Sequence, residues 1–136
     1  ICNQGIKINI FGELIKLPFE TRSVLKKTTE KRKKNRNIIV NLAINYGAKH
    51  EIMTAFKKTK KINILNMEKN LYSKNMPHPD IMIRTGGHQR LSNFMLWQMA
   101  YTELFFIKKL WPDFNSKDLQ KIINKYRKSK RNFGSI

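Results

Sequence analysis

The sequence predicts an α/β protein with a parallel sheet flanked by helices, and three kinds of observation point to that class. Short runs rich in β-branched and aromatic residues recur along the chain, each about as long as one strand. Segments with apolar residues at helical spacing separate these runs, and glycine, asparagine or proline stands at most boundaries. Because strands that alternate with helices form parallel sheets, we interpret residues 1–136 as a single domain of this class.

The first half of the chain contains two predicted strands and two predicted helices. Alternating isoleucines predict the first strand, and a short apolar run predicts the second as a buried strand. A polar segment beginning at Pro18 and an amphipathic segment after Gly47 predict the helices. In chain order, these elements are a strand over 6–11, a helix over 18–34, a strand over 37–44 and a helix over about 48–60.

The second half is predicted to contain two strands and two longer helices. A weakly patterned segment over 63–75 predicts a short helix or a loop, and the prolines at 77 and 79 predict extended backbone after it. The apolar run over 104–107 could continue a helix, but we favour a strand. The remaining elements are a strand over 80–84, a helix from Asn93, a turn over 111–114 and a helix that Asn115 or Ser116 caps.

A loop with two glycines and two arginines follows the predicted strand over 80–84. The glycines allow positive φ angles and a close approach of the backbone to an anion. Ser92 is placed to cap the next helix, whose free N–H groups favour a phosphate. Arg84 and Arg90 can each hold phosphate oxygens through paired hydrogen bonds. These residue types predict a phosphate or diphosphate site, and the alternative is an ordinary turn with two solvated arginines.

The chain is strongly basic, with 28 Lys and Arg against 9 Asp and Glu and a formal net charge of +19. Such a charge attracts nucleic acid, an anionic membrane surface or a phosphorylated substrate. Much of it lies in lysine runs, such as residues 57–61, which ordinarily cover solvated faces. No apolar run reaches the ~20 residues that a membrane span requires. We therefore expect a location in the cytoplasm or at a membrane surface, without secretion.

Three motifs lie in order along nearly the whole chain. The first is NLAINYGAKHEI over residues 41–52, and the last is RNFGS over 131–135. Between them, PDIMIRTGGHQRLSNFMLWQMAYTELFF…LWPDF runs from Pro79 to Phe114. Together they resemble the C-terminal portion of the cis-prenyltransferases, the undecaprenyl and dehydrodolichyl diphosphate synthases. The resemblance implies the fold of that portion and a homodimeric enzyme, and the basic charge is compatible with peripheral membrane contact.

The resemblance also implies an activity and a set of site residues. Family members condense isopentenyl diphosphate with an allylic diphosphate, which lengthens a polyprenyl diphosphate with a new cis double bond. The protein mainly positions two diphosphates and neutralises their charge, with Mg²⁺ as cofactor. The matching positions are Arg84, Gly86, Gly87, Arg90 and Ser92 for the isopentenyl diphosphate group, Glu103 for Mg²⁺, and Asn45 and Arg131 as supporting residues.

Several of these positions also have plainer interpretations. Without the resemblance, Glu103 would be a buried or capping acid, and Asn45 could simply cap the helix after it. The apolar residues over 38–42 match a tunnel for the growing chain, but they are equally typical of a core. Trp97, Trp111 and Phe114 are expected to be packing anchors rather than binding groups.

The chain departs from the family pattern at three places. His88 stands where the family has a glutamate, and Asn132 stands where it has an arginine that reaches the partner subunit's diphosphate. Arg131 is a candidate substitute for that arginine. The family's Asp-Gly-Asn-Gly-Arg motif has no equivalent in residues 1–136, so we expect the chain to hold half of an active site and not to elongate substrate unaided.

Two alternatives to an active enzyme remain open at this point. One is a non-catalytic subunit of a heteromeric prenyltransferase, which His88 and Asn132 permit and the retained arginines oppose. The other is a basic nucleic-acid-binding module, which only the charge suggests. Because the chain contains no recognised nucleic-acid motif, we expect no specific nucleic-acid partner.

Overall fold

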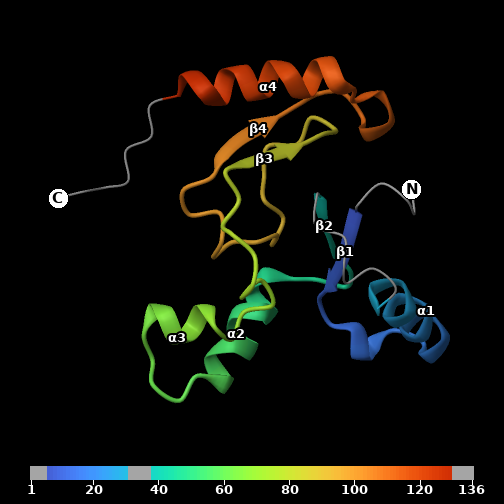
Figure 1. The fold of residues 1–136 in the computed structure, drawn as a ribbon. Coiled ribbons are helices and arrows are strands. Elements are labelled where there is room, and N and C mark those ends of the chain that lie inside the picture. Colours follow the sequence, from blue (N-terminus) through green and yellow to red (C-terminus); the bar gives the residue numbers. More distant parts are fainter. Residues whose placement is uncertain (1–5, 31–37, 130–136) are drawn as a thin grey trace. The chain divides into compact units, whose positions relative to one another are not determined.

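The fold is described from a computed structural model for residues 6–30 and 38–129 (Figure 1). The chain divides into two compact units, Ile1–Asn75 and Met76–Ile136, and each is described by itself. In each unit, the described residues form a pair of parallel strands with helices beside it, which confirms the predicted α/β class. The prediction of a single domain stays a prediction.

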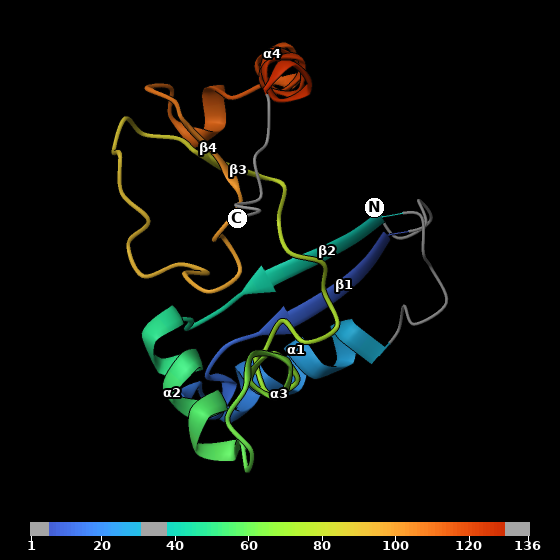
Figure 2. The same ribbon diagram turned by 90° about the vertical axis from the view of Figure 1, so that its left-hand side faces the viewer.

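The first unit is built on the parallel pair of β1 (Ile6–Phe11) and β2 (Ile38–Ala43). Ile6 lies opposite Ile38 and Phe11 lies opposite Ala43, and Figure 2 shows the two strands side by side. The other elements of this unit are a 3₁₀ helix η1 (Leu14–Lys16), α1 (Phe19–Glu30), α2 (Ala48–Lys58) and α3 (Ile64–Glu68). The strand and helix types agree with the sequence predictions, although the predicted end of the first helix at Lys34 lies outside the described residues.

The prediction that β2 is buried is wrong for this chain by itself. Ile38 is 56% exposed and Leu42 is 42% exposed. In the part of the chain that the structure describes, β1 is the one strand that pairs with β2, and α1 packs against β1. An apolar run predicts burial only where other elements cover both faces of the sheet. The small buried core of this unit lies instead around α2 and α3, at Ala48, Ala55, Met67 and Leu71.

The second unit is built on β3 (Ile81–Arg84) and β4 (Glu103–Phe106), which are also parallel. Arg84 lies opposite Phe106 at the carboxyl end of this pair. A 3₁₀ helix η2 (Trp111–Asp113) leads into α4 (Ser116–Lys128), which lies along β4 in Figure 1. The predicted cap of this helix is confirmed, because Asn115 is the N-cap and forms a capping box with Asp118.

The helix predicted from Asn93 is wrong, because residues 92–101 form turns and bends. Ser92, Asn93 and Met95 have φ angles of 49°, 62° and 44°, in the left-handed region. A right-handed helix cannot pass through residues in that conformation. The apolar positions that suggested the helix are mostly exposed, including Phe94, Ala100 and Tyr101, whereas Met99 is buried.

Trp111 is not the packing anchor that the sequence suggested. Its side chain is 74% exposed, and its ring stacks on Phe114 with a centroid distance of 6.3 Å. Among the described residues, no helix combines the length and apolar character that crossing a membrane requires.

Candidate diphosphate site

The predicted anion site lies where it would be expected in a parallel sheet. Arg84 is the last residue of β3, and the glycine loop begins directly after it. Ligands of open α/β sheets bind beyond the carboxyl ends of the strands. The loop therefore stands at the correct end of the second sheet for binding a ligand.

The side chain of Arg84 connects the residues that the sequence singled out in this loop. Its Nη1 atom donates a hydrogen bond to the Ser92 Oγ atom over 2.8 Å and another to the carbonyl oxygen of Arg90. The structure thus brings Arg84, Arg90 and Ser92 together. Their role as ligands of a diphosphate stays a prediction.

The two glycines have the positive φ angles that the sequence predicted, 86° at Gly86 and 76° at Gly87. Their N–H groups already have acceptors, however. Gly86 donates to the carbonyl of Lys109 over 2.8 Å, and Gly87 donates to that of Ile107 over 2.9 Å. The glycines therefore shape the loop and tie it to the segment after β4, and their own N–H groups are already used within the fold.

Ser92 does not act as a helix cap, because no helix begins after it and its own backbone is left-handed. The predicted contribution of a helix N-terminus to phosphate binding is therefore absent in this described loop. Ser92 contributes its hydroxyl group, which orients the Arg84 guanidinium. Orientation of a charged donor before binding reduces the entropy lost when an anion arrives.

A cavity of about 280 Å³ adjoins these side chains. One part of its wall is polar, with Arg84, Arg90 and Ser92. The rest is mainly apolar and includes Met82, Ile83, Leu91, Phe94 and Met99. This combination suits a small molecule with an anionic group at one end and a short hydrocarbon at the other.

Glu103 lies at the opposite end of the strand pair from Arg84. Glu103 is the first residue of β4 and lies opposite Ile81, whereas Arg84 lies opposite Phe106. The three residues from Glu103 to Phe106 correspond to about 10 Å along the strand. Among residues 6–30 and 38–129, no group of three or more acidic, histidine or cysteine side chains could hold a metal ion. The described residues therefore do not fit a Mg²⁺ site made by protein alone. Glu103 fits only as a single ligand of an ion that a diphosphate and water also bind.

Asn45 connects the loops that follow β1 and β2. The Asn45 Nδ2 atom donates a hydrogen bond to the backbone carbonyl of Glu13 over 3.1 Å. The backbone carbonyl of Asn45 accepts a hydrogen bond from the backbone N–H of Glu13, also over 3.1 Å. The alternative that Asn45 caps the next helix is wrong, because Gly47 is the N-cap of α2 and the Asn45 side chain is used elsewhere. The other supporting residue, Arg131, lies outside the described residues.

A cluster of charged residues after the carboxyl ends of β1 and β2 was not predicted from the sequence. The Glu13 carboxylate forms ion pairs with Lys16 and with His50. The hydrogen bond from Lys16 lowers the pKa of Glu13 below its ordinary value, and the charge of His50 acts in the same direction. The spacing of three between Glu13 and Lys16 was a usable local signal, whereas His50 is brought in by the fold.

Comparisons with known proteins agree with the motif order. The family model for undecaprenyl diphosphate synthase matches residues 1–134. An isoprenyl transferase of Clostridium perfringens is 40% identical over 144 residues, which cover 98% of this chain and 57% of that protein. The chain thus spans little more than half the length of this curated relative.

Two solved structures have the same fold over nearly the whole chain. A probable undecaprenyl diphosphate synthase from Campylobacter jejuni has a TM-score of 0.87 at 34% identity, covering 96% of this chain and 64% of that one. Lavandulyl diphosphate synthase from Lavandula x intermedia, solved with dimethylallyl diphosphate, has a TM-score of 0.91 at 31% identity, covering 98% and 62%. The chain belongs to the undecaprenyl diphosphate synthase family of cis-prenyltransferases.

Proposed function

We propose that this chain carries the isopentenyl diphosphate site of a transferase that elongates cis-polyprenyl diphosphates of the undecaprenyl or dehydrodolichyl type. The enzyme condenses isopentenyl diphosphate with an allylic diphosphate and works as a homodimer. The observation that carries the proposal is the cluster of Arg84, Arg90 and Ser92 beside a largely apolar cavity.

The cluster suits the two chemical parts of isopentenyl diphosphate. The guanidinium groups of Arg84 and Arg90 neutralise the diphosphate, and the Ser92 hydroxyl keeps Arg84 in place. The five-carbon group lies against apolar side chains such as Met82 and Phe94. Holding the diphosphate end fixed orients the double bond for attack on the allylic carbon, which lowers the barrier by positioning.

Mg²⁺ enters this proposal only together with substrate. Bound to a diphosphate, the ion supplies charge neutralisation, and Glu103 is the described carboxylate that the family resemblance assigns to it. The arginines hold the diphosphate through direct hydrogen bonds, without requiring the ion. We therefore expect binding of isopentenyl diphosphate to survive chelation of Mg²⁺ in weakened form.

Calorimetric titration of isopentenyl diphosphate into the 136-residue chain tests the proposal, with Mg²⁺ or with EDTA. Replacing both arginines, Arg84→Ala with Arg90→Ala, should weaken binding at least about a hundredfold, because each charge-assisted hydrogen bond contributes about 1.5–3 kcal/mol. The matched control is Arg127→Ala with Lys128→Ala, which removes two positive charges from exposed positions of α4. Equal affinity of the Arg84/Arg90 variant and the unchanged chain would overturn the assignment.

Inorganic diphosphate tests the apolar part of the cavity in the same assay. If the five-carbon group lies against Met82 and Phe94, isopentenyl diphosphate should bind more tightly than diphosphate alone. Equal affinities would mean that the loop is a general anion site. Binding that falls steeply with salt, but is insensitive to the two arginines, would instead favour a nucleic-acid-binding module.

A further inference from the structure

The surface of α4 has one strongly basic side. The helix contains five basic residues and one acidic residue, Asp118, with the basic ones at Lys117, Lys121, Lys125, Arg127 and Lys128. With 3.6 residues per turn, the four lysines fall within a sector of about 80° around the helix axis. They therefore form a continuous stripe along α4, which we call the lysine stripe.

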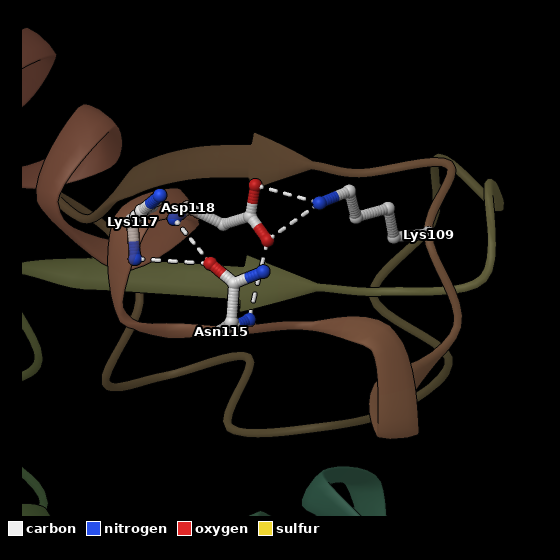
Figure 3. Close-up of polar contacts among 4 residues, drawn as sticks. All are labelled: Lys109, Asn115, Lys117 and Asp118. Carbon is white, nitrogen blue, oxygen red and sulfur yellow. Dashed lines mark hydrogen bonds and ion pairs between the residues drawn. The ribbon is translucent and has the colours of Figure 1, made fainter.

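The single carboxylate of α4 is paired with Lys109 and also interacts electrostatically with Lys121, so it offsets at most one of the five positive charges of the helix. The Lys109 Nζ atom lies 3.0 Å and 2.8 Å from the two carboxylate oxygens of Asp118, as Figure 3 shows. The backbone N–H of Asn115 donates to the same carboxylate. Among the described residues, Lys121 and Lys125 form no ion pair with any carboxylate.

A second cavity, of about 220 Å³, adjoins the stripe between β4 and α4. Lys121 and Lys125 contribute to its lining together with the ion-paired Lys109 and Asp118, and Phe106, Ile107 and Ile122 supply apolar surface. The lysines are exposed, whereas Ile122 is buried. The charged part of the lining consists of three lysines and one carboxylate, so it has a net positive charge beside the apolar floor. This combination is complementary to a phosphate group that is attached to hydrocarbon.

An exposed apolar segment precedes the same helix. Leu110 is 62% exposed and Trp111 is 74% exposed, and both lie within six residues of the first residue of α4. Tryptophan side chains favour the boundary between lipid headgroups and hydrocarbon, because one end of the indole is apolar and the other donates a hydrogen bond. A lysine surface that only faces water would not need an exposed apolar segment such as Leu110 and Trp111 beside it.

From these observations we propose that the lysine stripe of α4 and the cavity beside it dock on the anionic phospholipid headgroups of a membrane surface. Lys121 and Lys125 hold a lipid phosphate, and the apolar floor contacts the carbon atoms next to it. Basic helices of this kind bind anionic leaflets through roughly additive contributions from each lysine. A nucleic-acid backbone would match the charge but not the apolar floor, so lipid is the better fit. The inference does not depend on the assignment of the diphosphate site.

Co-sedimentation of the 136-residue chain with sucrose-loaded vesicles tests this surface. Vesicles of phosphatidylcholine with about a third phosphatidylglycerol should bind the chain, and vesicles of phosphatidylcholine alone should not. Lys121→Gln with Lys125→Gln should weaken binding about thirtyfold, the effect expected for losing two lysine contacts. Circular dichroism of each variant, which should match that of the unchanged chain, shows that the helices are retained.

The matched control is Lys57→Gln with Lys58→Gln, which replaces two exposed lysines at the end of α2. Its net charge equals that of the Lys121/Lys125 variant. This variant should bind the anionic vesicles as the unchanged chain does, and so should Arg84→Ala with Arg90→Ala. An equal loss in the two lysine variants would overturn the proposal, because binding would then follow total charge. Failure to bind anionic vesicles would also overturn it, as would tighter binding to random-sequence RNA with the same dependence on Lys121 and Lys125.

Discussion

The Arg84 guanidinium donates a hydrogen bond to the Ser92 hydroxyl 2.8 Å away, which joins the end of β3 to the far side of the glycine loop. Arg84 also donates to the Arg90 carbonyl, so one side chain connects three positions of the candidate site. The guanidinium is therefore oriented by the loop before any ligand arrives. This arrangement makes the loop's backbone conformation part of the site.

Ser92 has two separable roles, because its hydroxyl orients Arg84 and its backbone is left-handed. Ser92→Ala and Ser92→Gly should each weaken isopentenyl diphosphate binding about tenfold, the effect of losing one hydrogen bond. Glycine relieves the left-handed strain, whereas alanine keeps it. The Gly variant should therefore be more stable than the Ala variant by about 1 kcal/mol in urea denaturation. Equal stability would show that the backbone at Ser92 is not strained.

Gly12 and Gly86 provide a comparison between crowding and backbone strain. Both have positive φ, but a Cβ atom at Gly12 would lie 2.0 Å from the Ile44 carbonyl oxygen, whereas one at Gly86 would meet nothing within 4 Å. Gly86→Ala should cost about 1–2 kcal/mol of stability. Gly12→Ala should cost clearly more in the same urea denaturation. A larger loss of stability for Gly86→Ala than for Gly12→Ala would contradict the close packing of the loops that follow β1 and β2.

Glu51 is a buried carboxylate, 1% exposed, that organises the end of the first sheet. It accepts hydrogen bonds from the Tyr46 hydroxyl over 2.5 Å and from the Tyr72 N–H over 2.7 Å. Glu51→Gln replaces one acceptor oxygen with a donor, which should destabilise the chain by about 1–3 kcal/mol in thermal or urea unfolding. Glu20→Gln, at an exposed position of α1, makes the same change without the burial and should be nearly neutral.

Asp118 should make the stability of the second unit depend on pH. The hydrogen bond from Lys109, followed by that from the Asn115 backbone, lowers the pKa of Asp118 below its ordinary 3.8. A carboxylate with a lowered folded-state pKa stabilises the fold above its unfolded pKa, and this contribution disappears as the pH falls through the folded value. The loss therefore begins near pH 3.8 and continues below it.

Comparison of Asp118→Asn with the unchanged chain isolates that contribution. The difference in their unfolding free energies should be constant near neutral pH and shrink as the pH falls below 3.8. Asp113→Asn, in the neighbouring η2, serves as a control that removes one carboxylate outside the capping box. A difference between Asp118→Asn and the unchanged chain that stays constant down to low pH would show that the Lys109–Asp118 pair does not stabilise the folded state.

Local patterns in the sequence were sufficient for several elements. The alternation over residues 6–11 predicted β1, and the Asn115 cap with Asp118 three residues later marked the start of α4. These signals depend on interactions between residues a few positions apart, so the sequence contains them in full. The candidate site loop was likewise visible in the sequence, because its arginines, glycines and serine are neighbours in the chain.

Only the tertiary structure decided the features that depend on distant partners. The apolar spacing after Asn93 predicted a helix, but the left-handed backbone at Ser92 and Met95 produces turns instead. The Gly86 and Gly87 N–H groups are used by carbonyls about twenty residues later, and His50 reaches Glu13 only through the pairing of β1 with β2. Periodicity determines which face of a segment is apolar, whereas its neighbours in space determine whether that face is covered. For that reason the apolar strand β2 is exposed in this chain although its sequence is typical of a core.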